Sequence, residues 1–219
     1  DLAAQLHQEK SYLILSGDLV YAGDDDLYDT LLEKFILPVA PLFDRIYVTP
    51  GNHDIQRSVT NPSVAENLLL RPQQDYLYDS YGNLKLDCPY PGNNPLKNFS
   101  SFERAVSNSL ETNFYGSYDE NPDFQIVSLN SSWLSIPRAA GQTDRNKLRV
   151  DPAIIDHFTQ KSSKPSLKIA ITHHPLDWLD ETTRHQVEQR LTKYFDVVLY
   201  GHVHSPSAIS GEFNGGQCL

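Results

Sequence analysis

Histidine, aspartate and asparagine side chains cluster in four short segments of the sequence. The segments are Gly17-Asp18, Gly51-Asn52-His53-Asp54, Thr172-His173-His174-Pro175 and Gly201-His202-Val203-His204. Of the 8 histidines in the chain, those within the segments are His53, His173, His174, His202 and His204. Carboxylate, amide and imidazole ligands without cysteine suit Mn, Fe, Zn, Ni or Co, and not a structural zinc site built on thiolates. The pattern therefore predicts a transition-metal centre.

Each of these segments directly follows a short apolar run that is rich in β-branched residues. Strands are predicted over residues 12–16, 45–49, 124–130, 167–172 and 196–200. Helices are predicted over residues 2–10, 26–40, 98–110, 151–161 and 181–195, with Asp180 or Thr182 as the N-cap of the last. This alternation predicts a layered α/β fold in which the carboxyl ends of the strands meet at one ligand-binding edge. Gly17, Gly51 and Gly201 allow a sharp turn between strand and ligand.

The interval 55–123 interrupts this alternation. It is rich in Asn, Pro, Tyr and Ser, and it is too long for a plain loop. We predict one domain over residues 1–219, with 55–123 as an inserted cap that contains one or two helices and contacts the substrate. An irregular surface excursion is an equally good interpretation of the same residues.

The composition excludes several classes of function. The chain has 18 basic and 28 acidic residues, which disfavours nonspecific nucleic-acid binding and excludes a polybasic membrane patch. No apolar run reaches membrane-spanning length, and the first residues lack the order of a signal peptide. Cys88 and Cys218 form neither a CxxC pair nor a disulfide framework, so we expect a soluble, cytoplasmic protein. With 0 methionines in the chain, Asp1 is not expected to be the biological start, either because the chain is a fragment or because residues are missing from the sequence.

The order of the segments resembles the motifs of the calcineurin-like metallophosphoesterase superfamily. The motifs GD, GNHD, HHP and GHVH each follow a predicted strand, and together they extend from Gly17 to His204. The resemblance implies an α/β/β/α sandwich with a binuclear metal site at one edge. It also implies hydrolysis of a phosphate mono- or diester, with a nucleotide among the candidates, by in-line attack of a hydroxide that bridges two divalent or mixed-valence metal ions.

The same resemblance assigns roles to individual residues. Asp18 would bridge both ions, Asn52, His173 and His202 would complete the second site, and His204 would belong to the first. His173 is preferred to His174 because it stands two residues before Pro175. His53 would act as a general acid or stabilise developing charge, Asp54 would orient the His53 imidazole, and Arg57 would join Asn52 and His53 in binding the phosphate.

One family motif is missing. The superfamily carries an Asp-x-His motif on its first strand, and nothing upstream of Gly17 matches it, since Gln5 stands two residues before His7. We expect this motif to lie upstream of Asp1. Without it, the first metal would keep only Asp18 and His204.

Tyr21 and several other side chains have alternative interpretations. Gly17 to Tyr21 also fits the GDxxY motif of purple acid phosphatases, where the tyrosine binds iron, although an ordinary aromatic residue is the preferred interpretation. Arg138 and Arg145 could contact a phosphate, and Trp133 and Trp178 could stack on a base. Solvated arginines and packed tryptophans are the commoner cases.

Two other functions stay open. One is a manganese-dependent nuclease, which the acidic composition mildly disfavours. The other is a catalytically weak scaffold module of a larger signalling protein, in which case loss of metal ligands would be expected. A further domain could be fused to this chain or work with it.

Overall fold

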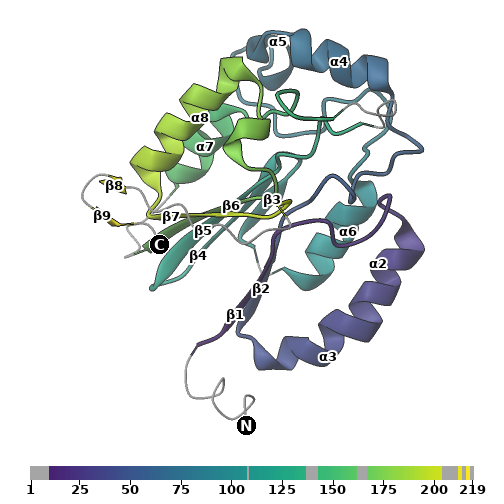
Figure 1. Ribbon diagram of the computed structural model, residues 1–219, viewed down its shortest axis with the longest axis vertical. Coiled ribbons are helices and arrows are strands. Elements are labelled where there is room, and N and C mark those ends of the chain that lie inside the picture. Colours follow the sequence, from purple (N-terminus) through teal and green to yellow (C-terminus); the bar gives the residue numbers. More distant parts are fainter. Residues whose placement is uncertain are drawn as a thin grey trace.

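The structure is a computed structural model that describes residues 10–107, 109–136, 143–161 and 167–203, with the backbone of two short strands, β8 (Glu212–Phe213) and β9 (Gly216–Gln217). It is a mixed α/β fold (Figure 1). The predicted strands are all present, as β1 (Tyr12–Leu15), β2 (Arg45–Val48), β5 (Phe124–Leu129), β6 (Leu167–Thr172) and β7 (Val197–Tyr200). Residues 2–9 of the helix predicted over 2–10, and the candidate ligand His204, lie outside the described residues.

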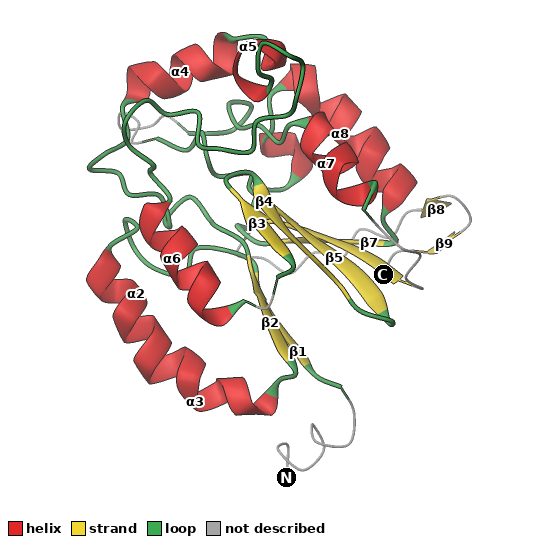
Figure 2. Cartoon of the chain, turned by 180° about the vertical axis from the view of Figure 1, so that it is seen from behind, coloured by secondary structure: helices red, strands yellow, loops and turns green. Residues whose placement is uncertain are grey.

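The strands that precede the motifs run parallel to their neighbours. β1 and β2 form a two-stranded parallel sheet, and a second sheet has the order β3-β4-β5-β6-β7, with β3 (Glu111–Asn113) and β4 (Gly116–Glu120) antiparallel and β5, β6 and β7 parallel (Figure 2). Every residue of β5 is buried, as expected for a strand covered on both faces. The motifs follow the carboxyl ends of these parallel strands.

Side chains connect the two sheets. Tyr47, Phe124, Ile126 and Ile171 form a small apolar cluster to which β2, β5 and β6 contribute. Near the carboxyl ends, the Ser128 hydroxyl donates to the Val48 carbonyl at 3.0 Å. These contacts hold the motif-bearing ends of both sheets in register.

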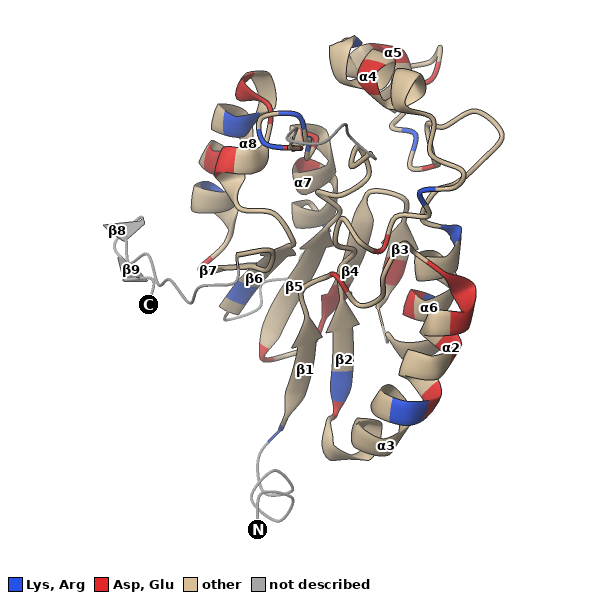
Figure 3. Ribbon diagram, turned by 45° about the vertical axis from the view of Figure 1, so that its right-hand side comes forward, with Lys and Arg blue, Asp and Glu red and all other residues tan. Residues whose placement is uncertain are grey.

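Helices accompany each sheet. α2 (Asp25–Leu31), α3 (Leu37–Val39) and α6 (Lys97–Val106) lie beside β1 and β2, whereas α7 (Pro152–Thr159) and α8 (Glu181–Tyr194) lie beside the five-stranded sheet (Figure 1). Acidic residues gather on α2 (Figure 3), whose first turn contains Asp25 and Asp26, where the helix dipole favours negative charge. Asp180 is the N-cap of α8 and accepts from the Thr182 N–H at 3.2 Å, as predicted. Among the described helices, none has the length and apolar character needed to cross a membrane.

The single helix predicted over 26–40 is interrupted. A π-helical turn, η1 (Leu32–Ile36), connects α2 to α3, and a 3-10 turn, η2 (Ala40–Leu42), follows. Pro38 and Pro41 lack the N–H that would continue α-helical hydrogen bonding, which is the physical reason for the break.

The interval 55–123 contributes both outer helices and sheet strands. It contains α4 (Pro62–Leu70), α5 (Gln73–Leu77), α6, β3 and β4. The strand prediction missed β3 and β4, because the sequences ETN and GSYDE are polar and have low β propensity. Asp119 of β4 is nevertheless buried, where it pairs with Arg45 and accepts from the Tyr47 hydroxyl at 2.7 Å. That the interval acts as a cap stays a prediction.

A buried carboxyl on α6 makes the stability depend on pH. Burial raises the pKa of Glu103 from about 4.5 to about 7, against the opposing effects of a Ser117 hydrogen bond and the charge of Arg104. The unfolded chain therefore ionises Glu103 at lower pH than the folded chain, and the wild type loses stability as the pH rises from about 4.5 to about 7. We expect Glu103→Gln to gain up to about 3 kcal/mol relative to wild type between pH 5 and pH 8, measured by urea unfolding. Glu188→Gln, on the exposed face of α8, is the control, and an equal gain in both variants would contradict the assignment.

Candidate metal centre

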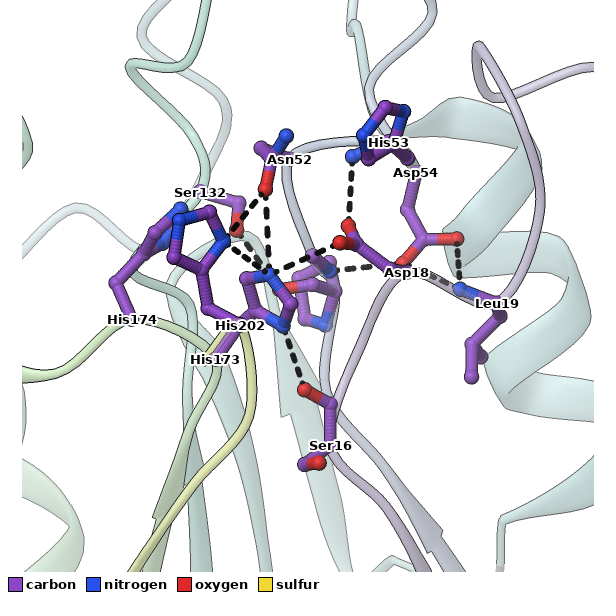
Figure 4. Close-up of polar contacts among 12 residues, drawn as sticks. Ser16, Asp18, Leu19, Asn52, His53, Asp54, Ser132, His173, His174 and His202 are labelled. Carbon is purple, nitrogen blue, oxygen red and sulfur yellow. Dashed lines mark hydrogen bonds and ion pairs between the residues drawn. The ribbon is translucent and has the colours of Figure 1, made fainter. Parts of the chain in front are cut away.

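Four side chains from four different loops converge at the carboxyl ends of the strands (Figure 4). Asp18 follows β1, Asn52 follows β2, His173 follows β6 and His202 follows β7. Asn52 Oδ1 lies 3.2 Å from His173 Nε2 and 3.1 Å from His202 Nδ1, and those two nitrogens are 3.2 Å apart. Asp18 Oδ2 lies 3.3 Å from His173 Nε2. The structure thus brings together four of the five predicted ligands.

The hydrogen bonding of His173 shows which of its ring nitrogens is available to bind a metal ion. His173 Nδ1 lies 2.7 Å from the Ser16 carbonyl oxygen, which can only accept, so Nδ1 carries a proton. His173 Nε2 then faces the acceptor oxygens of Asp18 and Asn52, and a metal ion between these atoms would bind all three. Ligands held at about 2.0–2.1 Å in tetrahedral geometry lie about 3.3 Å from one another, close to the observed spacing. An N–H donated to a backbone carbonyl is also the usual second contact of a metal-binding histidine. The donor set fits a metal ion.

The Asp18 carboxylate is ionised in this environment. Burial by itself raises the pKa of Asp18, but the hydrogen bond with His173, the charge of that side chain and the His53 N–H together outweigh burial and lower the pKa to about 2. The His53 N–H donates to Asp18 Oδ1 at 2.8 Å, which leaves Oδ2 directed at His173. Asp18 therefore offers a negative ligand atom at any physiological pH.

His174 lies next to this group and is almost completely buried. Its Nδ1 is 3.0 Å from the Ser131 hydroxyl, and its Nε2 has no hydrogen-bond partner among the described residues. Burial, followed by the charges of His173 and His202, lowers the pKa of His174 to about 2, so the ring is neutral. His173, His174 and His202 together could hold a metal ion, because their ligand atoms all lie within 4.8 Å of one another. The preference for His173 over His174 as the ligand stays a prediction.

Backbone conformation at the site explains the glycines in the motifs. Gly17 has φ of +98°, and a Cβ at this position would overlap the His173 ring. A Cβ at Gly51 would overlap Asp18 in the same way. Asp18 and His202 themselves adopt left-handed conformations, with φ of 56° and 62°. Such strained non-glycine residues are uncommon and concentrate at functional sites.

The hydrogen bonds of Asp54 differ from those expected for the predicted role of orienting the His53 imidazole. Its carboxylate accepts from the N–H groups of Leu19, Val20 and Gly51 at 3.1, 3.1 and 2.8 Å, and from the Tyr28 hydroxyl at 2.9 Å. Because these donors occupy both oxygens, Asp54 holds the loops after β1 and β2 together instead of orienting the His53 imidazole.

His53 is in contact with an aromatic side chain. Its ring stacks on Tyr21, with centroids 5.5 Å apart and planes inclined by 29°. The Arg57 guanidinium carbon lies 5.9 Å from the centroid of the Tyr21 ring. His53 Nδ1 is buried and has no hydrogen-bond partner among the described residues.

The two tryptophans differ in their surroundings, and packing, the preferred interpretation of the sequence, is confirmed for Trp133. Trp133 is fully buried and donates to the Arg149 carbonyl at 2.8 Å, so it is a packing residue. Trp178 lies against the candidate site, with its ring 4.2 Å from that of His202 and 5.7 Å from that of His174. Arg145 is exposed and pairs with Asp177, and Arg138 lies outside the described residues.

Ser131 was missed. It follows β5, whose carboxyl end lies at the same edge as the ends of β6 and β7. Like the histidines, Ser131 follows the carboxyl end of a parallel strand, which places it at the ligand-binding edge. A single serine, however, does not indicate a metal site in a sequence.

Comparison with known proteins agrees with this geometry. The chain matches the calcineurin-like phosphoesterase family over residues 1–206 and belongs to that family. It is 23% identical to the "Uncharacterized metallophosphoesterase-like protein YydB" of Bacillus subtilis (strain 168), over 90% of this chain and 41% of the relative. It is 26% identical to the "Probable cyclic nucleotide phosphodiesterase" of Moraxella catarrhalis (strain BBH18), over 90% of this chain and 60% of the relative. The chain thus spans roughly half the length of these relatives. The predicted resemblance is confirmed, and members of this family typically bind two metal ions.

Proposed function

We propose that this chain is a metal-dependent phosphoesterase that hydrolyses a phosphate mono- or diester. The observation that carries the proposal is the convergence of Asp18, Asn52, His173 and His202, whose ligand atoms lie 3.1 to 3.3 Å apart in the contacts described above. Within this group, the carboxylate and amide oxygens and the imidazole nitrogens are of the types that bind transition-metal ions. Membership of the calcineurin-like phosphoesterase family supports the same conclusion.

The predicted ligands would bind two metal ions. Asp18, Asn52, His173 and His202 would hold one ion, and Asp18 and His204 would contribute to a second. Ions of this kind lower the pKa of bound water and offset the charge of the phosphoryl oxygens. Mn, Fe, Zn, Ni and Co all suit the ligand set.

Other residues of the same loops would act on the phosphate ester. His53 would donate a proton to the leaving oxygen or stabilise its negative charge. Arg57 and Asn52 would contact the phosphoryl group. Asp54 would keep the two loops in register. The proposed substrate class is a nucleotide, and a cyclic nucleotide is the first compound to test because one relative is named for that activity.

For the architecture, we propose a four-layer α/β/β/α sandwich forming one domain, with 55–123 inserted as a cap. Support comes from the side chains of β2, β5 and β6 that pack together and from the helices that accompany each sheet. The substrate would then lie between the ligand loops and the interval 55–123.

The test is a metal-dependent assay of the full-length protein. Loaded with manganese, it should hydrolyse bis(p-nitrophenyl) phosphate or a 3′,5′-cyclic nucleotide, and Asn52→Ala should lower kcat/KM by about 100-fold because a ligand is lost. Gln189→Ala removes an exposed amide from α8 and should leave the rate unchanged. Equal rates for wild type and Asn52→Ala on every phosphate ester would contradict the proposal.

The same preparation distinguishes the alternatives. Cleavage of single- or double-stranded DNA with manganese, and of no small ester, would favour the nuclease. Absence of bound metal after loading would favour a scaffold module, whereas two tightly bound ions would count against it.

A further inference from the structure

In the part of the chain that the structure describes, no carboxylate forms a hydrogen bond with the imidazole of the catalytic candidate His53. Both oxygens of Asp54 are occupied by N–H groups and by the Tyr28 hydroxyl, and His53 Nδ1 is buried without a hydrogen-bond partner among the described residues. No described hydrogen bond therefore fixes the plane of the ring. A different contact has to do so.

Tyr21 provides a contact with the face of that ring. The two rings are 5.5 Å apart and inclined by 29°, and Tyr21 remains 66% exposed. A tyrosine that is this exposed contributes little to the core, so its packing does not explain its position. Stacking covers a face of the imidazole and does not engage its nitrogen atoms.

The turn that carries Tyr21 is fixed to the loop that carries His53. The Gly23 N–H donates to the His53 carbonyl at 2.8 Å. Gly23 has φ of +61°, and a Cβ there would come within 2.6 Å of the Asp54 carbonyl oxygen, so the two loops approach too closely for any other residue. Ala22 also adopts a left-handed conformation, with φ of 62°.

Arg57 supports the stack from the same loop as His53. Its guanidinium carbon lies 5.9 Å from the centroid of the Tyr21 ring, within the range of a cation–π contact. Tyr21 is thus held by its own turn and by contacts from both His53 and Arg57.

We propose that Tyr21 is a positioning residue, which holds the imidazole of His53 in the plane needed to serve the leaving oxygen of the phosphate ester. This inference rests on the proposed function, in which His53 protonates that oxygen or stabilises its charge. Tyr21 acts through His53 and does not itself touch the reacting atoms.

The leaving group provides the test. Loss of a positioned acid slows hydrolysis of an alkyl ester, whose leaving oxygen needs a proton, far more than hydrolysis of a p-nitrophenyl ester. In the full-length protein with manganese, Tyr21→Ala should lower kcat about tenfold on esters with an alkyl leaving group, with little change in KM. Suitable substrates are dimethyl phosphate and a 3′,5′-cyclic nucleotide. The same variant should lose less than about twofold on bis(p-nitrophenyl) phosphate. Tyr21→Phe keeps the ring and should retain the wild-type rate on all of these esters.

A double-mutant cycle separates positioning from a general structural effect. In a His53→Ala background, Tyr21→Ala should cause no further loss, because its partner is already absent. Losses that multiply, or losses that are equal for good and poor leaving groups, would overturn the inference, as would a Tyr21→Phe variant as slow as Tyr21→Ala. If wild type and Asn52→Ala are equally inactive, the proposed function itself fails, and that result is distinct from an active wild type with an unaffected Tyr21→Ala variant.

Discussion

Replacement of His202 by alanine is expected to abolish tight manganese binding. His202 Nδ1 lies 3.1 Å from Asn52 Oδ1 and 3.2 Å from His173 Nε2, so its removal takes one ligand from a group of four. Loss of a direct ligand should weaken affinity by at least about 100-fold, the upper end of what is seen for residues that only support a ligand. The dissociation constant can be measured by calorimetry, and the bound metal by elemental analysis after dialysis.

Trp178 offers an independent readout of the same event. Its ring lies 4.2 Å from that of His202, whereas Trp133 is buried in the core. Manganese should therefore quench Trp178 fluorescence in the wild type, and His202→Ala should show no quenching at the same metal concentration. His185→Ala, which removes an exposed histidine from α8, is the control and should bind as the wild type does. Undiminished affinity in His202→Ala would remove His202 from the ligand set.

Replacement of Asp54 by alanine is expected to have the largest effect on stability. The Asp54 carboxylate is buried and accepts from three backbone N–H groups and one hydroxyl. In the Asp54→Ala variant these buried donors have no acceptor, which should lower the free energy of unfolding by about 3–5 kcal/mol. Urea denaturation of the two proteins measures the difference.

Tyr28→Phe is the matched control for this prediction. It removes one donor, the hydroxyl that lies 2.9 Å from Asp54 Oδ1, and keeps the buried ring. Its cost should be about 1 kcal/mol. An Asp54→Ala protein as stable as wild type, yet inactive, would indicate that Asp54 acts on the chemistry and does not hold the loops together.

Much of the fold could be predicted because it depends on local patterns. β6 is a mostly apolar, β-branched segment that ends at a motif, and both of its ends were predicted without error. β4 could not be predicted in this way, because GSYDE is polar and becomes a strand only by pairing with β5 and by burying Asp119 against Arg45 and Tyr47. Tertiary contacts outweigh weak local propensity at such positions.

The order of the motifs, by itself, determined the family of this protein and which residue types gather at one edge of the parallel strands. That much is available from sequence because strand direction and the position of a residue after a strand are local properties. Only the tertiary structure decided how the gathered side chains face one another. It directs His173 Nε2 toward Asp18 and Asn52, assigns Asp54 to the backbone of two loops, and sets Tyr21 against the ring of His53. These arrangements depend on ring orientation and on hydrogen bonds between segments far apart in the chain, which no local pattern encodes.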